Sequence, residues 1–193
     1  MELSEDILQC ANLVKQGDYE RYRVIMTLDP KFRSDLFVLM AANIEISRAP
    51  WASRESLISE IRLRWWLEAI EEIESDKAVR RHFVTSPLED ILSRSQSKLI
   101  KENITARSWD INTDPHLNER ELFNYINRTS GNIWAVAAEL LGGSQKIGRL
   151  LGMQWVLFNI AKRVRNLLKE VGPRFLNLKR KSFKIFCNGE KLN

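Results

Sequence analysis

Apolar residues recur along most of this chain at the three- and four-residue spacing of amphipathic helices. Glycines, prolines and short polar stretches interrupt that spacing and mark the helix ends. No stretch shows the strict alternation of apolar and polar residues that is typical of a strand, so the pattern predicts an all-α fold. The expected helices are Glu5–Gln16, Tyr19–Leu28, Phe32–Ser47, Ser56–Asp76, Ser86 to about Ala106, Glu119 toward Leu141, and Ile147–Leu168, with a loop at Asp110–Asn118.

The fourth expected helix contains two adjacent tryptophans within a run of charges, "SEIRLRWWLEAIEEI". At about 100° per residue, one helix face should be apolar and buried. Its members would be Ile58, Ile61, Trp65, Trp66, Ala69 and Ile73. Arg62 falls in the middle of this face, and a buried guanidinium needs an anion. Three candidates follow: an internal carboxylate from Glu45 or Asp110, the phosphate of a bound ligand, or water at a helix end.

Length and composition are those of an ordinary globular domain, with 193 residues of which 44% are hydrophobic. The sequence has no apolar run of about 18 residues and no signal or transit pattern at its start, so we expect a cytoplasmic protein, with peripheral contact to the inner face of the membrane as a further possibility. Cys10 and Cys187 are far apart, and this predicts neither a disulfide framework nor a metal site.

Positive charge is concentrated at the C-terminal end. Residues 162–193 hold ten Lys or Arg and two Glu, a net charge of +8, whereas the whole chain carries +5. We therefore expect a domain over residues 1–170 and a basic, divergent tail over 171–193. Such a tail could touch anionic lipid or simply be solvated. Nucleic acid is a less favoured partner because no readout motif accompanies the charge.

Common catalytic motifs are missing from the sequence, including the phosphate-binding, dinucleotide-binding, zinc-protease and serine-hydrolase patterns. His82 and His116 each stand alone in a polar stretch, which is typical of surface histidines. The residues by themselves therefore do not indicate an enzyme.

Several short stretches, taken in order, resemble the squalene/phytoene synthase family of head-to-head prenyl synthases. They are "GDYERY" from Gly17, "LFVLMAANIEISR" from Leu36, "EIRLRWWLEAIEEI" from Glu60, "ARSWDI" from Ala106, "YINRTSGNIWAVAAELLG" from Tyr125 and "GMQWVLFNIAKRV" from Gly152. The resemblance covers roughly residues 17–168. It implies an all-α, single-domain helical bundle of the isoprenoid synthase type that is short at its C-terminal end.

In that family, two aspartate-rich motifs bind magnesium ions that hold the diphosphates of two prenyl donors. The stretch that matches the first motif, Ser47–Trp51, reads "SRAPW", and the stretch that matches the second, Arg163–Leu167, reads "RVRNL". Neither contains a carboxylate. Glu45 lies just before the first stretch, and Asn159 is the polar residue kept in the last helix. This departure from the two family motifs predicts a protein without magnesium chemistry and without a cofactor.

The family has a degenerate branch that includes the mitochondrial complex I assembly factor of this fold and its bacterial relatives, and "AANIEI" from Ala41 resembles that branch. We interpret the chain as a non-catalytic binding or assembly protein with no catalytic residues. The expected substrate-binding residues are Tyr22, Glu45, Arg62 and Asn159. The expected partners are a prenyl diphosphate or anionic lipid, and a protein or a second copy of the chain covering the face left by absent C-terminal helices. The alternative is a magnesium-dependent transferase condensing two prenyl diphosphates.

Overall fold

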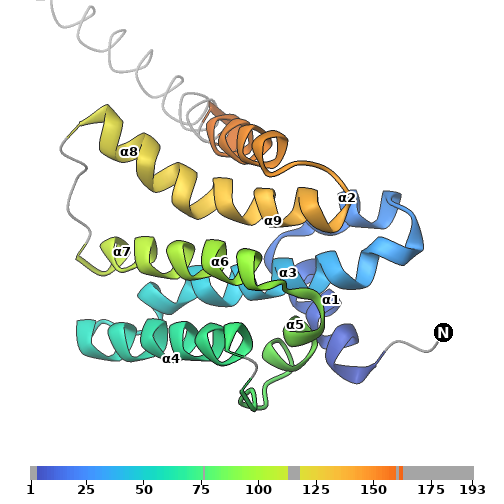
Figure 1. Cartoon of the computed structure of the whole chain (residues 1–193). Coiled ribbons are helices and arrows are strands. Elements are labelled where there is room, and N and C mark those ends of the chain that lie inside the picture. The colour runs from blue at the N-terminus through green and yellow to red at the C-terminus, as the bar shows by residue number, and fades with distance from the viewer. Residues whose placement is uncertain (1–3, 76, 113–117, 160, 163–193) are drawn as a thin grey trace, which may run out of the picture. The chain divides into compact units, whose positions relative to one another are not determined.

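The computed structural model describes residues 4–75, 77–112, 118–159 and 161–162. The chain divides into two compact units, Met1–Met153 and Gln154–Asn193. Every regular element among the described residues is helical (Figure 1), which confirms the predicted all-α fold.

The first unit begins with α1 (Glu5–Gly17), α2 (Tyr19–Thr27) and α3 (Pro30–Arg48). Each helix starts at a polar cap: the side chains of Ser4, Asp18 and Asp29 accept hydrogen bonds from backbone N–H groups in the first turn. Asp18 also closes α1, and Pro30 is the first residue of α3. These boundaries lie within two residues of those predicted from the sequence.

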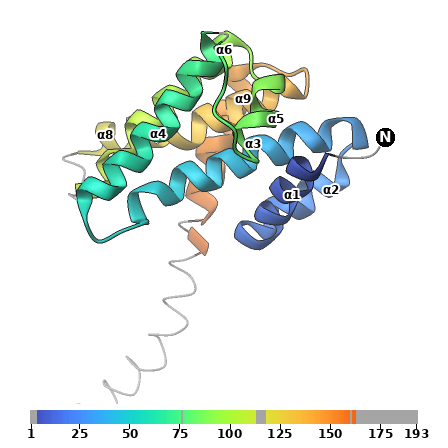
Figure 2. The ribbon, with the colours of Figure 1, turned by 90° about the horizontal axis from the view of Figure 1, so that it is seen from below.

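The longest run of buried residues belongs to α3, from Leu36 to Ile44, because this helix is covered on several sides. It packs against α1, α2, α5 (Thr85–Ile91) and α9 (Asn132–Leu140). Figures 1 and 2 both show α3 between other helices, with α1 and α2 beside its first half. This all-round burial explains why α3 reads as a nearly continuous apolar run and not as an amphipathic stripe.

A short 3₁₀ turn, η1 (Ala49–Trp51), connects α3 to α4 (Ser56–Glu74). Pro50 lies inside η1, where its missing N–H ends the α-helical hydrogen bonding of α3. The buried Ser59 hydroxyl donates a hydrogen bond to the Pro50 carbonyl at 2.8 Å. This bond joins α4 to η1 and fixes the corner at which the candidate site lies.

One predicted helix, from Ser86 to about Ala106, is wrong in its continuity, since the structure has α5 and then α6 (Arg94–Arg107). Ser93 starts α6 with a capping box, in which the Ser93 side chain accepts from the Gln96 N–H and the Gln96 side chain accepts from the Ser93 N–H. This local arrangement favours a new helix start over continuation. α6 then packs along α4.

The predicted loop at Asp110–Asn118 begins as a one-turn helix, α7 (Trp109–Asn112). The helix predicted from Glu119 is present as α8 (Glu119–Ile126), a π turn η2 (Asn127–Gly131) and α9. Residues 145–153 are helical and cross this segment closely. A Cβ atom on Gly148 would lie 2.2 Å from the Trp134 carbonyl oxygen, so only glycine permits this approach.

The second unit is described only at residues 154–159 and 161–162, which are helical. Within it the Asn159 side chain donates a hydrogen bond to the Trp155 carbonyl at 2.8 Å. The predicted tail at 171–193 lies outside the described residues, and the proposed division at residue 170 stays a prediction. Among the described helices, none combines the length and the apolar character required to cross a bilayer.

Candidate functional site

A pocket of about 610 Å³ lies at the corner formed by α3, η1 and α4. This volume falls in the range of small-molecule sites. Its lining residues come from these three elements, from the connection between η1 and α4, and from the loop after α4: Glu45, Arg48, Ala49, Trp51, Ala52, Arg62, Trp65, Trp66 and His82. The pocket therefore combines indole rings with two guanidinium groups, one carboxylate and one imidazole.

An aromatic cluster forms one wall of the pocket. The rings of Trp65 and Trp66 meet edge-on with centroids 4.9 Å apart, and the His82 ring lies 5.5 Å from the first and 5.6 Å from the second. The Nδ1 atom of His82 accepts a hydrogen bond from the Val84 N–H at 3.2 Å, an arrangement that favours the neutral imidazole. Burial lowers the pKa of His82, while the charges of Glu45 and Asp6 oppose that shift.

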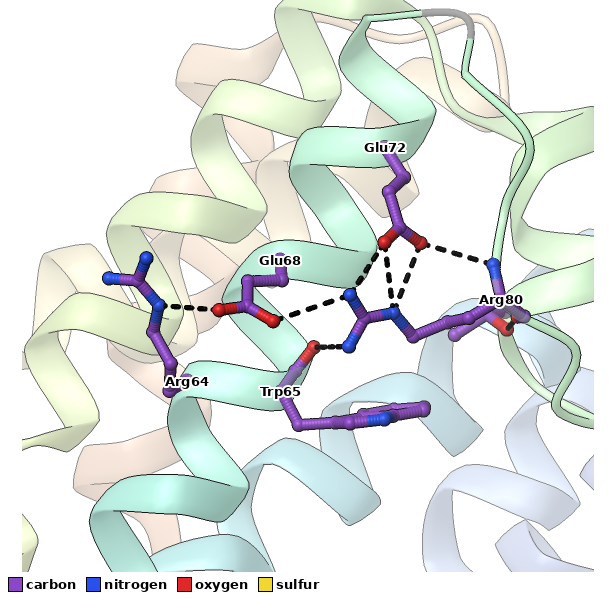
Figure 3. A network of polar contacts seen from close by, with 6 residues as sticks. Arg64, Trp65, Glu68, Glu72 and Arg80 are labelled. Carbon is purple, nitrogen blue, oxygen red and sulfur yellow. Dashed lines mark hydrogen bonds and ion pairs between the residues drawn. The ribbon is translucent and has the colours of Figure 1, made fainter.

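The loop that carries His82 is held to α4 by Arg80 (Figure 3). The Arg80 Nε atom donates to both oxygens of Glu72, at 3.0 and 3.1 Å, and another nitrogen reaches the Glu68 carboxylate at 3.3 Å. The guanidinium also donates to the Trp65 carbonyl and lies 5.3 Å from the Trp65 ring centroid. Hydrogen bonding to Arg80 lowers the pKa of Glu72, which keeps this pair charged. The network thus fixes both the loop and the indole of the pocket wall.

Three charged side chains line the pocket without a partner among the described residues. In the part of the chain that the structure describes, Glu45, Arg48 and Arg62 form no side-chain hydrogen bond and no ion pair. Arg48 and Arg62 are exposed, and Glu45 is half-buried. Two guanidinium groups that form no ion pair with any described residue are available to an anion, because arginine binds phosphates and carboxylates in a bidentate manner.

The predicted buried face of α4 is partly wrong. Ile58 and Ile61 are 38% and 59% exposed, and Arg62 is also exposed. The face that packs into the fold is rotated toward Ser59, Leu63, Trp66, Ala69, Ile70 and Ile73. Tertiary packing against α6 selected this face, whereas the sequence offers two apolar faces on the same helix. Arg62 therefore lies at the pocket and not in the core.

Asp110 does not pair with Arg62, the partner considered from the sequence. Its carboxylate accepts a hydrogen bond from the Tyr125 hydroxyl at 2.6 Å and pairs with Arg107 at 3.2 Å. Burial raises the pKa of Tyr125, and the nearby Asp110 adds to that shift. Arg62 forms no ion pair with Asp110 or Glu45 among the described residues, so the internal-carboxylate hypothesis for Arg62 is wrong.

The structure brings together two of the four predicted binding residues, since Glu45 and Arg62 both line the pocket. Tyr22 does not line it; its ring stacks on Phe37 at 5.5 Å and on Tyr19 at 6.2 Å. Asn159 belongs to the second compact unit. The binding roles of all four residues stay predictions.

Sequence reasoning missed Arg48, Trp51 and His82 as members of this site. Arg48 and Trp51 lie in the stretch that matches the first metal motif of the family. Their presence where the family pattern has aspartates was the signal that could have identified them. His82 gave no such signal, because only the fold brings its loop back to the tryptophan pair.

The donor set of the pocket does not fit magnesium. Mg²⁺ requires oxygen ligands in near-octahedral geometry, commonly carboxylates. Here Glu45 is the single carboxylate of the lining, and two guanidinium groups accompany it. More widely, the described residues include no cluster of three or more His, Cys, Asp or Glu side chains suited to a metal. The stretch at 163–167 lies outside the described residues, and its sequence contains no carboxylate.

Comparison with known proteins agrees with the all-α architecture. The family profile of squalene/phytoene synthases matches residues 14–171. Curated relatives include "NADH dehydrogenase (ubiquinone) complex I, assembly factor 6" from Bos taurus, 29% identical over 145 residues, and from Homo sapiens, 28% identical over 145 residues. The Drosophila melanogaster homolog is 28% identical over 140 residues.

These matches cover 69% of this chain but only 40 to 42% of the relatives' length. The chain thus spans about two fifths of the curated relatives that it matches. No solved structure matches it significantly. Because the family profile covers most of the chain, including α3, η1 and α4 that form the pocket, this protein belongs to the squalene/phytoene synthase family.

Proposed function

We propose that this protein is a non-catalytic member of its family that acts as a binding protein in the assembly of a larger protein complex. The observation that carries the proposal is the charge of the pocket. Arg48 lies in the stretch that matches the first aspartate-rich motif of the family, Arg62 lines the same pocket from α4, and Glu45 is the single acidic residue of the lining. A prenyl diphosphate leaves as a group only when its developing negative charge is neutralised, and in this family metal ions do that.

Two guanidinium groups can bind an anion directly, but they do not replace a metal cluster. Arginine neutralises part of the ground-state charge of a phosphate, and it supplies neither the charge density of several divalent ions nor their rigid oxygen geometry. A phosphate-bearing amphiphile such as a prenyl diphosphate would then be held without turnover, its apolar part against Trp65 and Trp66. We propose that the protein works without a magnesium cofactor.

The relatives support the assembly role, because those that match are named as complex I assembly factors. We propose that this chain likewise assists a respiratory complex of the NADH dehydrogenase type. Since it spans two fifths of those relatives, the partner contacts themselves form part of the proposal.

Catalysis is tested by incubating the purified protein with farnesyl or geranylgeranyl diphosphate, Mg²⁺ and a reductant, and by measuring released pyrophosphate. We expect no release above a heat-denatured control. Release that depends on Mg²⁺ and on native protein would establish the alternative, a transferase that condenses two prenyl diphosphates.

The assembly role needs a separate test in the organism that encodes the protein. Deleting the gene should reduce the fully assembled NADH dehydrogenase complex on native gels, while smaller subassemblies accumulate. A plasmid copy of the wild-type gene should restore the complex. Unchanged amounts of the assembled complex in the deletion strain would contradict the proposed role.

A further inference from the structure

The first half of α4 presents a second apolar face that no other described element covers. Leu57 is 64% exposed, Ile61 59% and Ile58 38%, and Trp51 on the adjoining turn η1 is 63% exposed. On a helical wheel Leu57, Ile58 and Ile61 lie within an arc of about 100°. The packed face with Leu63 and Trp66 lies on the other side. We call Trp51, Leu57, Ile58 and Ile61 the η1–α4 face.

Large exposed apolar groups scattered singly are normal, but a contiguous set marks an interaction surface. Figure 1 shows α4 at the margin of the first unit, with α3 and α6 on its inner side. The η1–α4 face is therefore accessible to a partner of broad, flat shape.

Three exposed arginines border the η1–α4 face. Arg48, Arg54 and Arg62 are exposed next to it, against the single carboxylate of Glu55 in the connecting loop. Glu60 is a second exposed carboxylate, about 60° beyond Leu57 on the wheel, at the edge of the face opposite Arg62. Another carboxylate of the helix, Glu68, is engaged by Arg64 and Arg80. In the described part of the chain, the three arginines have no hydrogen-bond or ion-pair partner.

We propose that the η1–α4 face docks onto a bilayer that contains anionic phospholipids. Trp51, Leu57 and Ile61 enter the interfacial layer, and Arg48, Arg54 and Arg62 bind lipid phosphates. Tryptophan is favoured at the membrane–water interface because its ring is apolar and its N–H is polar. Apolar side chains flanked by basic ones are the pattern of peripheral membrane contacts.

Two further observations favour lipid over a protein surface as the occupant. The pocket opens beside this face and places Arg48 and Arg62 where a lipid headgroup could enter. The net charge of +8 on residues 162–193 attracts the same chain to anionic surfaces, wherever that segment lies. The inference does not depend on the absence of catalysis, since a catalytic protein could dock in the same way.

The test is co-sedimentation of the full chain with vesicles of equimolar phosphatidylcholine and phosphatidylglycerol, compared with vesicles of phosphatidylcholine alone. We expect strong binding to the anionic vesicles only. Ile61→Ser should weaken this binding about fivefold or more, as burial of an aliphatic side chain predicts. Ile147→Ser, at a residue 58% exposed on another helix, is the matched control and should leave binding unchanged.

The charge contribution has its own matched pair. Arg62→Gln should weaken binding about fivefold, since one basic residue near an anionic surface contributes roughly that factor. Arg120→Gln removes the same charge from the exposed side of α8, which α6 separates from α4 in Figure 1, and should change binding less than about twofold. All four substituted residues are on the surface, and circular dichroism should show the wild-type fold.

Three results would overturn the inference. Failure of the wild-type protein to bind anionic vesicles is the first. Equal effects of Ile61→Ser and Ile147→Ser would assign binding to charge elsewhere in the chain. Sedimentation showing a dimer that Ile61→Ser dissociates would instead assign the face to a second copy of the chain. None of these results bears on pyrophosphate release, so the two proposals fail independently.

Discussion

The pair of half-buried Arg107 and buried Asp110 gives the sharpest stability prediction. Asp110 is 6% exposed, and its carboxylate holds both the Arg107 guanidinium and the Tyr125 hydroxyl. Asp110→Asn keeps an acceptor for Tyr125 but removes the negative charge. The Arg107 side chain, 19% exposed, would then lose its anionic partner and keep only neutral ones, such as the Tyr125 hydroxyl at 3.0 Å. Removing one member of a buried ion pair typically costs 3–5 kcal/mol, so we expect about 3 kcal/mol here because Asn retains part of the hydrogen bonding.

The assay is urea unfolding followed by circular dichroism, combined with double-mutant cycles. Asp110→Asn and Arg107→Gln should show a coupling of about 1–3 kcal/mol because the two side chains are in direct contact. Asp110→Asn and Arg62→Gln should be additive within about 0.5 kcal/mol, since Arg62 lies at the pocket and does not contact Asp110. Coupling to Arg62 in place of Arg107 would refute the assignment of these charges.

Three further predictions concern the packing and the pocket. Gly148→Ala should lower the unfolding free energy by at least about 1–3 kcal/mol in calorimetry, because the added methyl would lie 2.2 Å from the Trp134 carbonyl; an unchanged melting temperature would contradict this close approach. Since burial lowers the pKa of His82, its neutral form stabilises the fold fully above about pH 6.5 and progressively less as the pH falls through the lowered value. His82→Gln should therefore lose less stability than wild type between about pH 7 and 5 in urea titrations, and parallel curves would exclude the effect. Arg80→Gln should speed amide hydrogen exchange in residues 77–84, because it releases the loop from Glu72; wild-type exchange rates would show that the loop is held by other contacts.

Most helix boundaries could be predicted because they depend on nearby residues. The starts of α1, α2 and α3 follow from Ser4, Asp18 and Asp29 with the apolar spacing that comes after them. The break between α5 and α6 was missed, although Ser93 and Gln96 have the spacing of a capping box. The apolar spacing continues across residues 86–106 and predicts one long helix. The cap at Ser93, although it depends only on neighbouring residues, overrides that spacing.

The orientation of α4 could not be predicted, because its first half carries apolar residues on two faces. Burial of Leu63 or of Ile61 satisfies the same helical period, and only the packing of α4 along α6 decides between them. The same ambiguity misplaced Arg62 in the core. Arg62 lies between the two apolar faces of α4. It belongs to a surface pocket beside the uncovered face and forms no buried ion pair among the described residues.

The composition of the pocket was predictable only in part. Loss of carboxylates at Ser47–Trp51 is visible in the sequence, and so is the gain of Arg48. The meeting of His82 with Trp65 and Trp66 depends on the loop that Arg80 pins to α4, which is a long-range contact without a local sequence pattern.

We propose that this pocket holds negative groups through arginines and not through divalent metal ions. Crystals of the protein soaked with Mn²⁺ and a non-hydrolysable prenyl diphosphate analogue would test it, since manganese is located by its anomalous scattering. We predict no anomalous peak in the pocket and, where the analogue binds, phosphate oxygens at hydrogen-bond distance from Arg48 and Arg62. A manganese ion held there by carboxylates from two helices would contradict the account.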